Sequence, residues 1–241
     1  MENGILVGLS RQSALRRDLD VVANNLANVN TTGFKRARAH FESFVPTQPA
    51  AGPRGGRPVF VRDVATVTDT APGRLDSTGN PFDLAIRGDG YFVVDTDQGP
   101  RYTRDGHFRP DLTGRMVTES GDALLSAGGQ PILVPLDDGD VVVASDGTVS
   151  TNSGPIDSVG VVRFDAPAGL RREGTGYWSA DEKPAPVPAP EIVAGSLERS
   201  NVEPILEITR MIRVNRAYQQ ARQIVDQEND RITKMIEIYR A

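Results

Sequence analysis

Hydrophobic residues near the N-terminus recur at alternating steps of four and three positions. A heptad spacing of this kind is typical of a helix that packs along another helix. Gly33, in the sequence TTGF, follows the series and tolerates the left-handed conformation that often ends a helix. We therefore predict an N-terminal helix within residues 1–35. The members of the series are Leu15, Leu19, Val22, Leu26 and Val29.

The C-terminal segment repeats the same rhythm over a longer stretch. Ser200 and Glu203 have the spacing of a capping box, and Pro204 is compatible with the first turn of a helix. A helix over residues 200–241 would be about 60 Å long, so we expect it to pack along the N-terminal helix or a neighbouring copy. Its apolar series comprises Met211, Val214, Tyr218, Ala221, Val225, Ile232, Met235 and Tyr239.

The middle of the chain alternates short apolar runs with turn sequences such as Asp105-Gly106. Such regular spacing predicts strands of a β-barrel or sandwich-like domain over residues 81–182. The expected strands lie at residues 82–86, 91–94, 102–104, 116–118, 141–143 and 159–164.

Two segments connect this domain to the helices. Residues 36–80 have a poorer pattern and a Pro- and Gly-rich stretch, so we expect an extended arm with a loop at residues 47–58. Residues 183–199 begin with the Pro-Ala sequence KPAPVPAPE and predict an extended linker. The predicted fold class is α+β, with paired, coiled-coil-like terminal helices and an inserted all-β domain.

Composition narrows the possible functions. The chain of 241 residues has no cysteine, two histidines and a net charge of −5. Thiol catalysis and cysteine zinc sites are excluded, and the lack of a dense basic block argues against a nucleic-acid partner. The N-terminus has no pattern of a cleaved signal peptide, and no apolar run is long enough to span a membrane.

Candidate chemical motifs have simpler structural explanations. Asp95, Asp97 and Gly99 resemble the start of a calcium loop, but the later ligand positions are missing, which favours a β-turn. His107 has no recognisable nucleophile or orienting acid beside it in the sequence. We predict no catalytic, cofactor-binding or metal site and no small-molecule substrate.

The stretch ANNLANVNTTGFK, at residues 23–35, is unusually rich in asparagine for a segment of helical spacing. It resembles the N-terminal motif of the flagellar basal-body rod and hook family. DLAIRGDGYFVV, YTRDGHF and TGRMVTESGDALL in the middle of the chain are similar to the same family, as is the C-terminal helix. The matching positions of the N-terminal motif are Ala23, Asn24, Asn25, Ala27, Asn28, Thr31, Gly33, Phe34 and Lys35.

The resemblance implies a structural axial subunit of the bacterial flagellum rather than an enzyme. Such subunits leave the cell through the flagellar type III export apparatus and assemble helically into the periplasmic rod, with themselves and other rod subunits as partners. The first residues and the length are most similar to a proximal rod subunit. A distal rod or hook-type subunit is the alternative.

Three sets of residues are expected to carry this function. The predicted subunit interface comprises Leu15, Leu19, Val22, Asn24, Asn25, Leu26, Asn28, Val29, Met211, Val214, Tyr218, Ala221, Val225, Ile232 and Met235. The predicted hinge or turn comprises Thr31, Thr32, Gly33 and Phe34. The possible export element comprises Ile5, Leu6, Val7, Phe41 and Val45.

A rival hypothesis of another class is an extracytoplasmic glycan-binding β domain on a coiled-coil stalk. Glycan binding requires exposed aromatic platforms. The candidates in this chain are Tyr91, Tyr177 and Trp178, so their burial distinguishes the two hypotheses.

Overall fold

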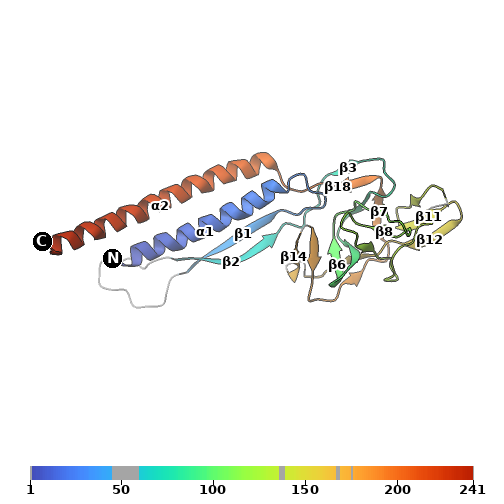
Figure 1. Ribbon diagram of the computed structural model, residues 1–241, viewed down its shortest axis with the longest axis horizontal. Coiled ribbons are helices and arrows are strands. Elements are labelled where there is room, and N and C mark those ends of the chain that lie inside the picture. The colour runs from blue at the N-terminus through green and yellow to red at the C-terminus, as the bar shows by residue number, and fades with distance from the viewer. Residues whose placement is uncertain (1, 45–59, 136–138, 167–168, 175, 241) are drawn as a thin grey trace. The chain divides into compact units, whose positions relative to one another are not determined.

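The computed structural model describes residues 2–44, 60–135, 139–166, 169–174 and 176–240 (Figure 1). The chain forms two compact units. The helical unit comprises Met1–Ala27, Ala37–Asp69 and Glu203–Ala241, and the β unit comprises Asn28–Arg36 and Thr70–Val202. The chain therefore passes from the helical unit into the β unit twice and returns twice.

Two long helices pack together in the helical unit, which confirms the predicted pairing of the chain ends. They are α1 (Glu2–Ala27) and α2 (Pro204–Arg240). Val22, Val214 and Ala221 are buried in this unit, as the apolar series requires. A Cβ at Gly8 would lie 2.6 Å from Cγ2 of Val225, so glycine permits a close approach of the two helices there.

Both helices are shorter than predicted at the ends that join the β unit. α1 ends at Ala27, so Asn28 and Val29 lie in the following turn and do not continue the helical series. α2 begins at Pro204, not at Ser200. Proline has no backbone N–H and a fixed φ, which suits the first position of a helix.

A two-stranded antiparallel ribbon occupies the segment expected to be an irregular arm. β1 (Ala37–Phe44) pairs with β2 (Phe60–Thr68), with a register shift between His40 and Phe41. The ribbon packs on α1, which lies between it and α2 (Figure 1). The neighbouring Pro- and Gly-rich stretch hides the strand pattern of residues 60–68 in the sequence. The loop expected at residues 47–58 lies outside the described residues.

The β unit contains short strands joined by turns, and each predicted run falls on one of them. Its largest sheet has nine strands, with the order β14-β15-β6-β5-β9-β8-β7 and with β13 bridging β5 and β16. Three smaller sheets are β10-β11-β12, β17-β4 and β18-β3. The bounds are β3 Leu75–Ser77, β4 Leu84–Arg87, β5 Tyr91–Thr96, β6 Gly99–Thr103, β7 Arg109–Pro110, β8 Met116–Val117, β9 Ala123–Leu124, β10 Val142–Val143, β11 Thr148–Thr151, β12 Gly154–Ser158, β13 Val161–Arg163, β14 Arg171–Glu173, β15 Tyr177–Ser179, β16 Ala185–Pro186, β17 Glu191–Ala194 and β18 Ser196–Glu198.

Two buried clusters form the core of the β unit. The larger one is aliphatic around Phe92 and Phe108, whose rings meet edge to face at 5.3 Å between centroids. The smaller one is aromatic and contains Tyr91, Tyr102, Phe164 and Trp178. Edge-to-face ring pairs stabilise such a cluster beyond the area they bury.

The segment expected to be a Pro-rich linker belongs to the β unit. β17 pairs with β4, so that Ile192 lies opposite Ile86, and β18 pairs with β3. Because the partner strands lie about a hundred residues earlier in the chain, their pairing has no local signal in the sequence.

Candidate assembly interface

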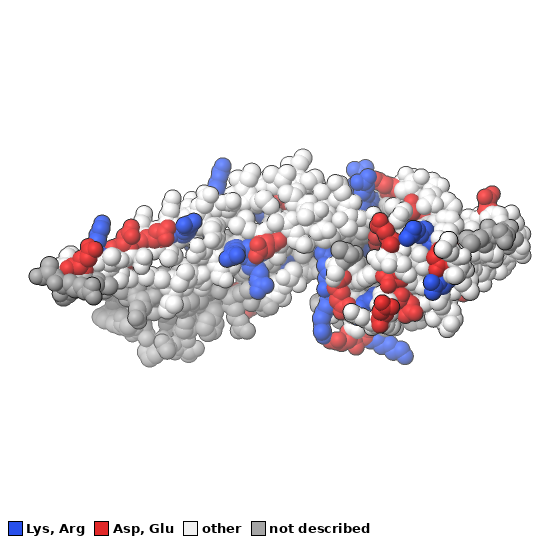
Figure 2. Space-filling model, in the orientation of Figure 1, with Lys and Arg blue, Asp and Glu red and all other residues white. Residues whose placement is uncertain are grey.

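The face of α2 that points away from α1 is apolar over the first turns of the helix. Ile205, Ile208 and Ile212 follow one another at steps of three and four, which places them on one side of the helix. All three are exposed, Ile205 at 78%. We call these residues the isoleucine face. The surface over the first half of α2 is largely uncharged (Figure 2).

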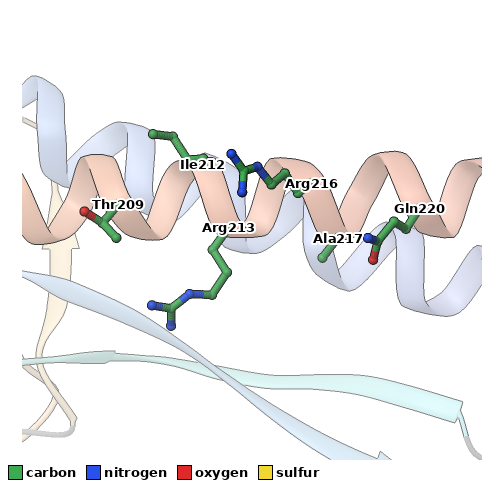
Figure 3. Close-up of a pocket in the computed structure, with 6 residues that line it drawn as sticks. All are labelled: Thr209, Ile212, Arg213, Arg216, Ala217 and Gln220. Carbon is green, nitrogen blue, oxygen red and sulfur yellow. The ribbon is translucent and has the colours of Figure 1, made fainter.

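A shallow groove of about 450 Å³ adjoins the isoleucine face (Figure 3). Ile212 and Arg216 project to one side of α2, and Arg213 projects to the other. The groove thus combines an apolar surface with guanidinium groups, which suit a partner helix that carries both apolar and acidic side chains. Its lining residues are Thr209, Ile212, Arg213, Arg216, Ala217 and Gln220.

The predicted helix seam lies mainly between α1 and α2 of the same chain. Polar contacts also join the two helices, including Arg210 Nη2 to Asp18 Oδ1 at 2.9 Å and Gln12 Nε2 to Tyr218 Oη at 3.2 Å. The role of these seam residues in contacts between subunits remains a prediction. Half-buried members of the seam are Leu15, Leu19, Leu26, Met211, Tyr218, Val225, Ile232 and Met235.

Sequence reasoning missed the isoleucine face because the heptad series drew attention to the opposite side of α2. The available signal was a second set of apolar residues out of phase with the first. Further exposed apolar residues of the two helices are Leu6, Leu9, Leu206, Ile224 and Ile238.

Asn25 is the asparagine of the motif that fastens α1 to its surroundings within the helical unit. It is fully buried, and its Nδ2 donates to the Ala37 carbonyl oxygen at 2.8 Å while its Oδ1 accepts from the Ala37 amide at 2.9 Å. Nδ2 also lies 3.4 Å from Oε2 of the buried Glu207. A side-chain amide can donate and accept at once, so Asn25 binds both the N–H and the carbonyl oxygen of Ala37, the first residue of β1.

The other two asparagines of the predicted interface have different settings. Asn24 is exposed on α1, and Asn28 accepts in the following turn, where its carbonyl oxygen receives the Thr31 amide at 3.2 Å. Thr31 and Thr32 are half-buried there.

Gly33 ends this turn with φ of 66°, as its place in the sequence predicted. A Cβ at this position would lie 2.4 Å from the carbonyl carbon of Arg104. The Gly33 amide donates to the Glu198 carbonyl oxygen at 2.7 Å. The turn is therefore packed directly against the β-unit backbone, and Phe34 beside it is buried.

Lys35 forms the centre of a buried ionic cluster in the β unit. Its Nζ lies 2.6 Å from Glu198 Oε1, and both side chains are only 1% exposed. Lys35 Nζ also donates to the Ala71 carbonyl oxygen at 2.9 Å. Arg104 Nη1 lies 3.2 Å from the second oxygen of Glu198. Buried charges are tolerated only when they are paired and hydrogen-bonded in this way.

Arg172 closes the cluster from the other side. Its guanidinium lies 4.0 Å from the Phe34 ring centroid and 4.9 Å from that of Trp178, and its Nη2 donates to the Lys35 carbonyl oxygen at 3.2 Å. A guanidinium stacked between two aromatic rings holds both in place. The motif residues 33–35 are thus anchoring residues of the β unit.

The aromatic residues that could have formed a glycan platform are not available for one. Tyr91 and Trp178 are buried. Tyr177 is half-buried, and its hydroxyl donates to Asp122 Oδ2 at 2.6 Å. Burial, helped by the hydrogen bond to Asp122, raises the pKa of Tyr177. By the criterion set from the sequence, these positions weigh against the glycan-binding hypothesis.

The candidate chemical motifs occupy structural turns. His107 Nδ1 lies 2.8 Å from Asp83 Oδ1 and braces the β4 region. The Asp95 to Gly99 segment forms the β5–β6 turn, where the Thr96 hydroxyl donates to the Gly99 carbonyl oxygen at 2.7 Å. Over the described residues, no cluster of three or more potential metal ligands occurs, and no helix has the length and apolarity to span a membrane.

Comparison with known families covers both ends and the middle of the chain. Residues 5–35 match the family described as "Flagella basal body rod protein", and residues 193–238 match "Flagellar basal body rod FlgEFG protein C-terminal". Residues 85–151 match "Flagellar hook protein FlgE/F/G D1 domain". Paired terminal helices around an inserted β region, with these matches, define an axial protein of the flagellum.

Proteins that are similar over nearly the full length of the chain identify its family within this class. The chain is 40% identical to the flagellar basal-body rod protein FlgF of Caulobacter vibrioides, over 94% of this chain and 93% of that protein. It is 37% identical to FlgF of Mesorhizobium japonicum, over 91% and 90%. It is 32% identical to FlgG of Bacillus subtilis, over the whole of both chains. The chain belongs to the flagellar basal-body rod protein family and is most like FlgF. It is a structural subunit of the rod, not an enzyme.

Proposed function

We propose that this rod subunit occupies the proximal, periplasmic part of the rod and assembles helically with its own copies and with other rod subunits. The observation that carries the proposal is the isoleucine face of α2. It is apolar and exposed, and it lies on the side of the helix opposite Val214 and Ala221. A row of isoleucines on a soluble helix is typical of an interface that a partner covers.

The energetics favour such a partner. Burying one large aliphatic side chain contributes about 1.5–3 kcal/mol. The three isoleucines together can therefore stabilise association, with Arg213 and Arg216 beside them adding polar specificity. Contacts between unlike surfaces of identical subunits generate open helical assemblies when the rotation between neighbours does not close a ring.

Export through the type III apparatus agrees with the position of the predicted export element. Ile5, Leu6 and Val7 lie within α1, and Phe41 lies within β1; Val45 falls outside the described residues. In the folded chain these apolar residues are part of regular elements. They can form an extended signal only before the helical unit folds, which supports recognition of an unfolded chain.

Deletion of the gene, followed by electron microscopy of basal bodies, tests the assembly function. We expect truncated or absent rods and non-motile cells. Complete rods in motile deletion cells would rule the function out.

The interface itself is tested by complementing the deletion with the double variant Ile208→Asp/Ile212→Asp. We expect loss of rods with unchanged helix content of the purified protein, because both side chains are exposed in the single chain. The matched control is Gln219→Asp/Gln223→Asp, which adds the same charge to exposed positions of the same helix and keeps the isoleucines. Rods in both strains would contradict a role of the isoleucine face.

A further inference from the structure

The β7–β8 turn presents a leucine to solvent. Leu112 is 97% exposed, the largest exposed fraction among the large hydrophobic residues of the described chain. An apolar side chain at the tip of a turn contributes nothing to the core of its own unit. This leucine is free to enter an apolar pocket of another molecule, which would remove its side chain from water.

The turn that carries Leu112 is held rigidly by Asp111. Its Oδ1 accepts hydrogen bonds from the Thr113 hydroxyl at 2.6 Å, the Thr113 amide at 2.8 Å and the Arg115 amide at 2.9 Å. Its Oδ2 pairs with Arg115 at 2.8 Å. These hydrogen bonds, that of the Thr113 side chain first, hold the pKa of Asp111 well below its usual range. A pre-organised turn loses little conformational entropy when Leu112 binds a partner.

A second feature of the β unit is a pocket of about 580 Å³ beside the Pro-rich segment that follows β16. Val159, Val161 and Val187 contribute apolar walls, and Pro190 borders it. Of the described residues that line the pocket, Asp146 alone is charged. The pocket can therefore accept an aliphatic side chain whose flank carries a positive charge.

The turn and the pocket are complementary in chemistry and charge. Leu112 matches the apolar walls, and exposed Arg109, which borders the same surface hollow as Leu112, matches Asp146. Among the described residues none lines both surfaces, and Leu112 is not inside the pocket of its own chain. We propose that Leu112 of one copy inserts into the Val159–Val187 pocket of a neighbouring copy in the rod.

Such a contact joins two different surfaces of the same protein, so it can continue from copy to copy along an open helix instead of pairing two copies about a two-fold axis. It would add a contact between β units to the contact that we assign to the isoleucine face. The inference rests on the proposed assembly function, but it concerns a separate surface and can fail alone.

Cysteine cross-linking tests the contact, because the chain has no cysteine of its own. The double variant Leu112→Cys/Ala189→Cys places one thiol on the turn and one at the exposed rim of the pocket. In oxidised basal bodies that contain this variant as the full chain, we expect disulfide-linked dimers and higher multimers of the subunit. Each single variant should give at least ten-fold less multimer.

The matched control is Asp97→Cys/Ala189→Cys, in which the first thiol lies on the exposed β5–β6 turn instead. The proposal would be overturned if the control gave as much disulfide-linked multimer as the test pair, or if the test pair gave none in complete rods. A cross-link of either cysteine to a different rod subunit would also overturn it.

A second measurement separates this contact from folding and from the general assembly function. Leu112→Asp should unfold at the same temperature as the unchanged protein, because the side chain is exposed. Cells that carry this variant in place of the unchanged protein should nevertheless form swimming halos less than half as wide as those of wild-type cells. Wild-type swimming with a stable fold would overturn the Leu112 contact and leave the proposed rod function intact, since that function fails only if the deletion strain builds complete rods.

Discussion

Individual residues of the N-terminal motif hold the fold by polar contacts in places where water is excluded. Burial of Lys35 and Glu198 is compensated by their ion pair. Lys35 also donates to the Ala71 carbonyl oxygen, and Glu198 also pairs with Arg104. Removal of Lys35 from this cluster leaves Glu198 buried with Arg104 as its remaining ionic partner, so the cluster is compensated only in part. The motif residue Lys35 is therefore expected to matter more for stability than an ion pair at the surface.

Replacement of Lys35 by methionine should lower the free energy of unfolding of the β unit by about 3–5 kcal/mol, because the buried Glu198 would lose its nearest ionic partner. Urea denaturation followed by Trp178 fluorescence measures the change. The control Arg87→Met breaks an exposed pair with Glu191, which also joins β4 to β17, and should cost about 1 kcal/mol or less. Equal losses in the two variants would refute a special role of the buried cluster.

Asn25 provides a second prediction for a single side chain. Asn25→Ala removes a partner from both the amide and the carbonyl group of half-buried Ala37, and an unsatisfied group costs about 1–3 kcal/mol when it is fully buried. We expect the helical unit to lose about 2–4 kcal/mol, as measured by circular dichroism at increasing urea concentration. Exposed Asn24→Ala is the control, with a loss of about 0.5 kcal/mol or less. A similar loss for both would show that the hydrogen bonds of Asn25 to Ala37 have no special weight, since helix propensity alone favours alanine at both positions.

At the scale of elements, the turn between α1 and β1 combines a conformational requirement with a packing requirement. Gly33 has a positive φ, and its α-carbon also faces the Arg104 backbone, so a side chain has neither a relaxed conformation nor space. Gly79 has a similar φ of 75° but open space around its α-carbon. A comparison of alanine variants at the two glycines therefore separates the cost of the left-handed backbone conformation, which both share, from the cost of the close contact, which only Gly33 has.

Gly33→Ala should destabilise the β unit by about 1–3 kcal/mol more than Gly79→Ala, because overpacking adds to the cost of the left-handed conformation. Thermal unfolding of the two variants, measured side by side, gives the comparison. If the two losses are equal, the contact between Gly33 and the Arg104 backbone has no energetic weight.

At the scale of the whole molecule, the β unit is closed by segments from both ends of its sequence. Residues 28–36 provide Lys35, and residues 191–198 provide β17, β18 and Glu198. By contrast, no described residue of α1 or α2 belongs to its two hydrophobic clusters. The β unit therefore should not need the long helices for its own stability, but it should need the segment that leads into α2.

Two truncated chains test this arrangement. A chain that ends at residue 202 should keep a cooperative unfolding transition of the β unit, because it retains β17, β18 and Glu198. A chain that ends at residue 190 should lose it, because β4 and β3 lose their partners and Lys35 loses its counter-ion. Calorimetry distinguishes the two. A transition of equal temperature and enthalpy in both would contradict closure by residues 191–198.

The sequence by itself determined the elements that depend on local periodicity. The heptad series predicted α1 and α2, alternating runs and turn residues predicted strands such as β5 and β13, and Gly33 marked the turn after α1. The motif at residues 23–35 was sufficient to indicate the family, which the comparisons then established. These features were accessible because helix faces, turn conformations and motif spacing are properties of neighbouring residues.

Only the tertiary structure decided which distant residues meet. The β17–β4 pairing, the Lys35–Glu198–Arg104 cluster and the binding of Ala37 by Asn25 join positions that have no shared local pattern. Exposure also depends on what covers a residue. The apolar series of α2 packs largely against α1 of the same chain, whereas Ile208 and Leu112 remain at the surface. Sequence periodicity shows where apolar side chains gather, but packing decides which of them are left for a partner.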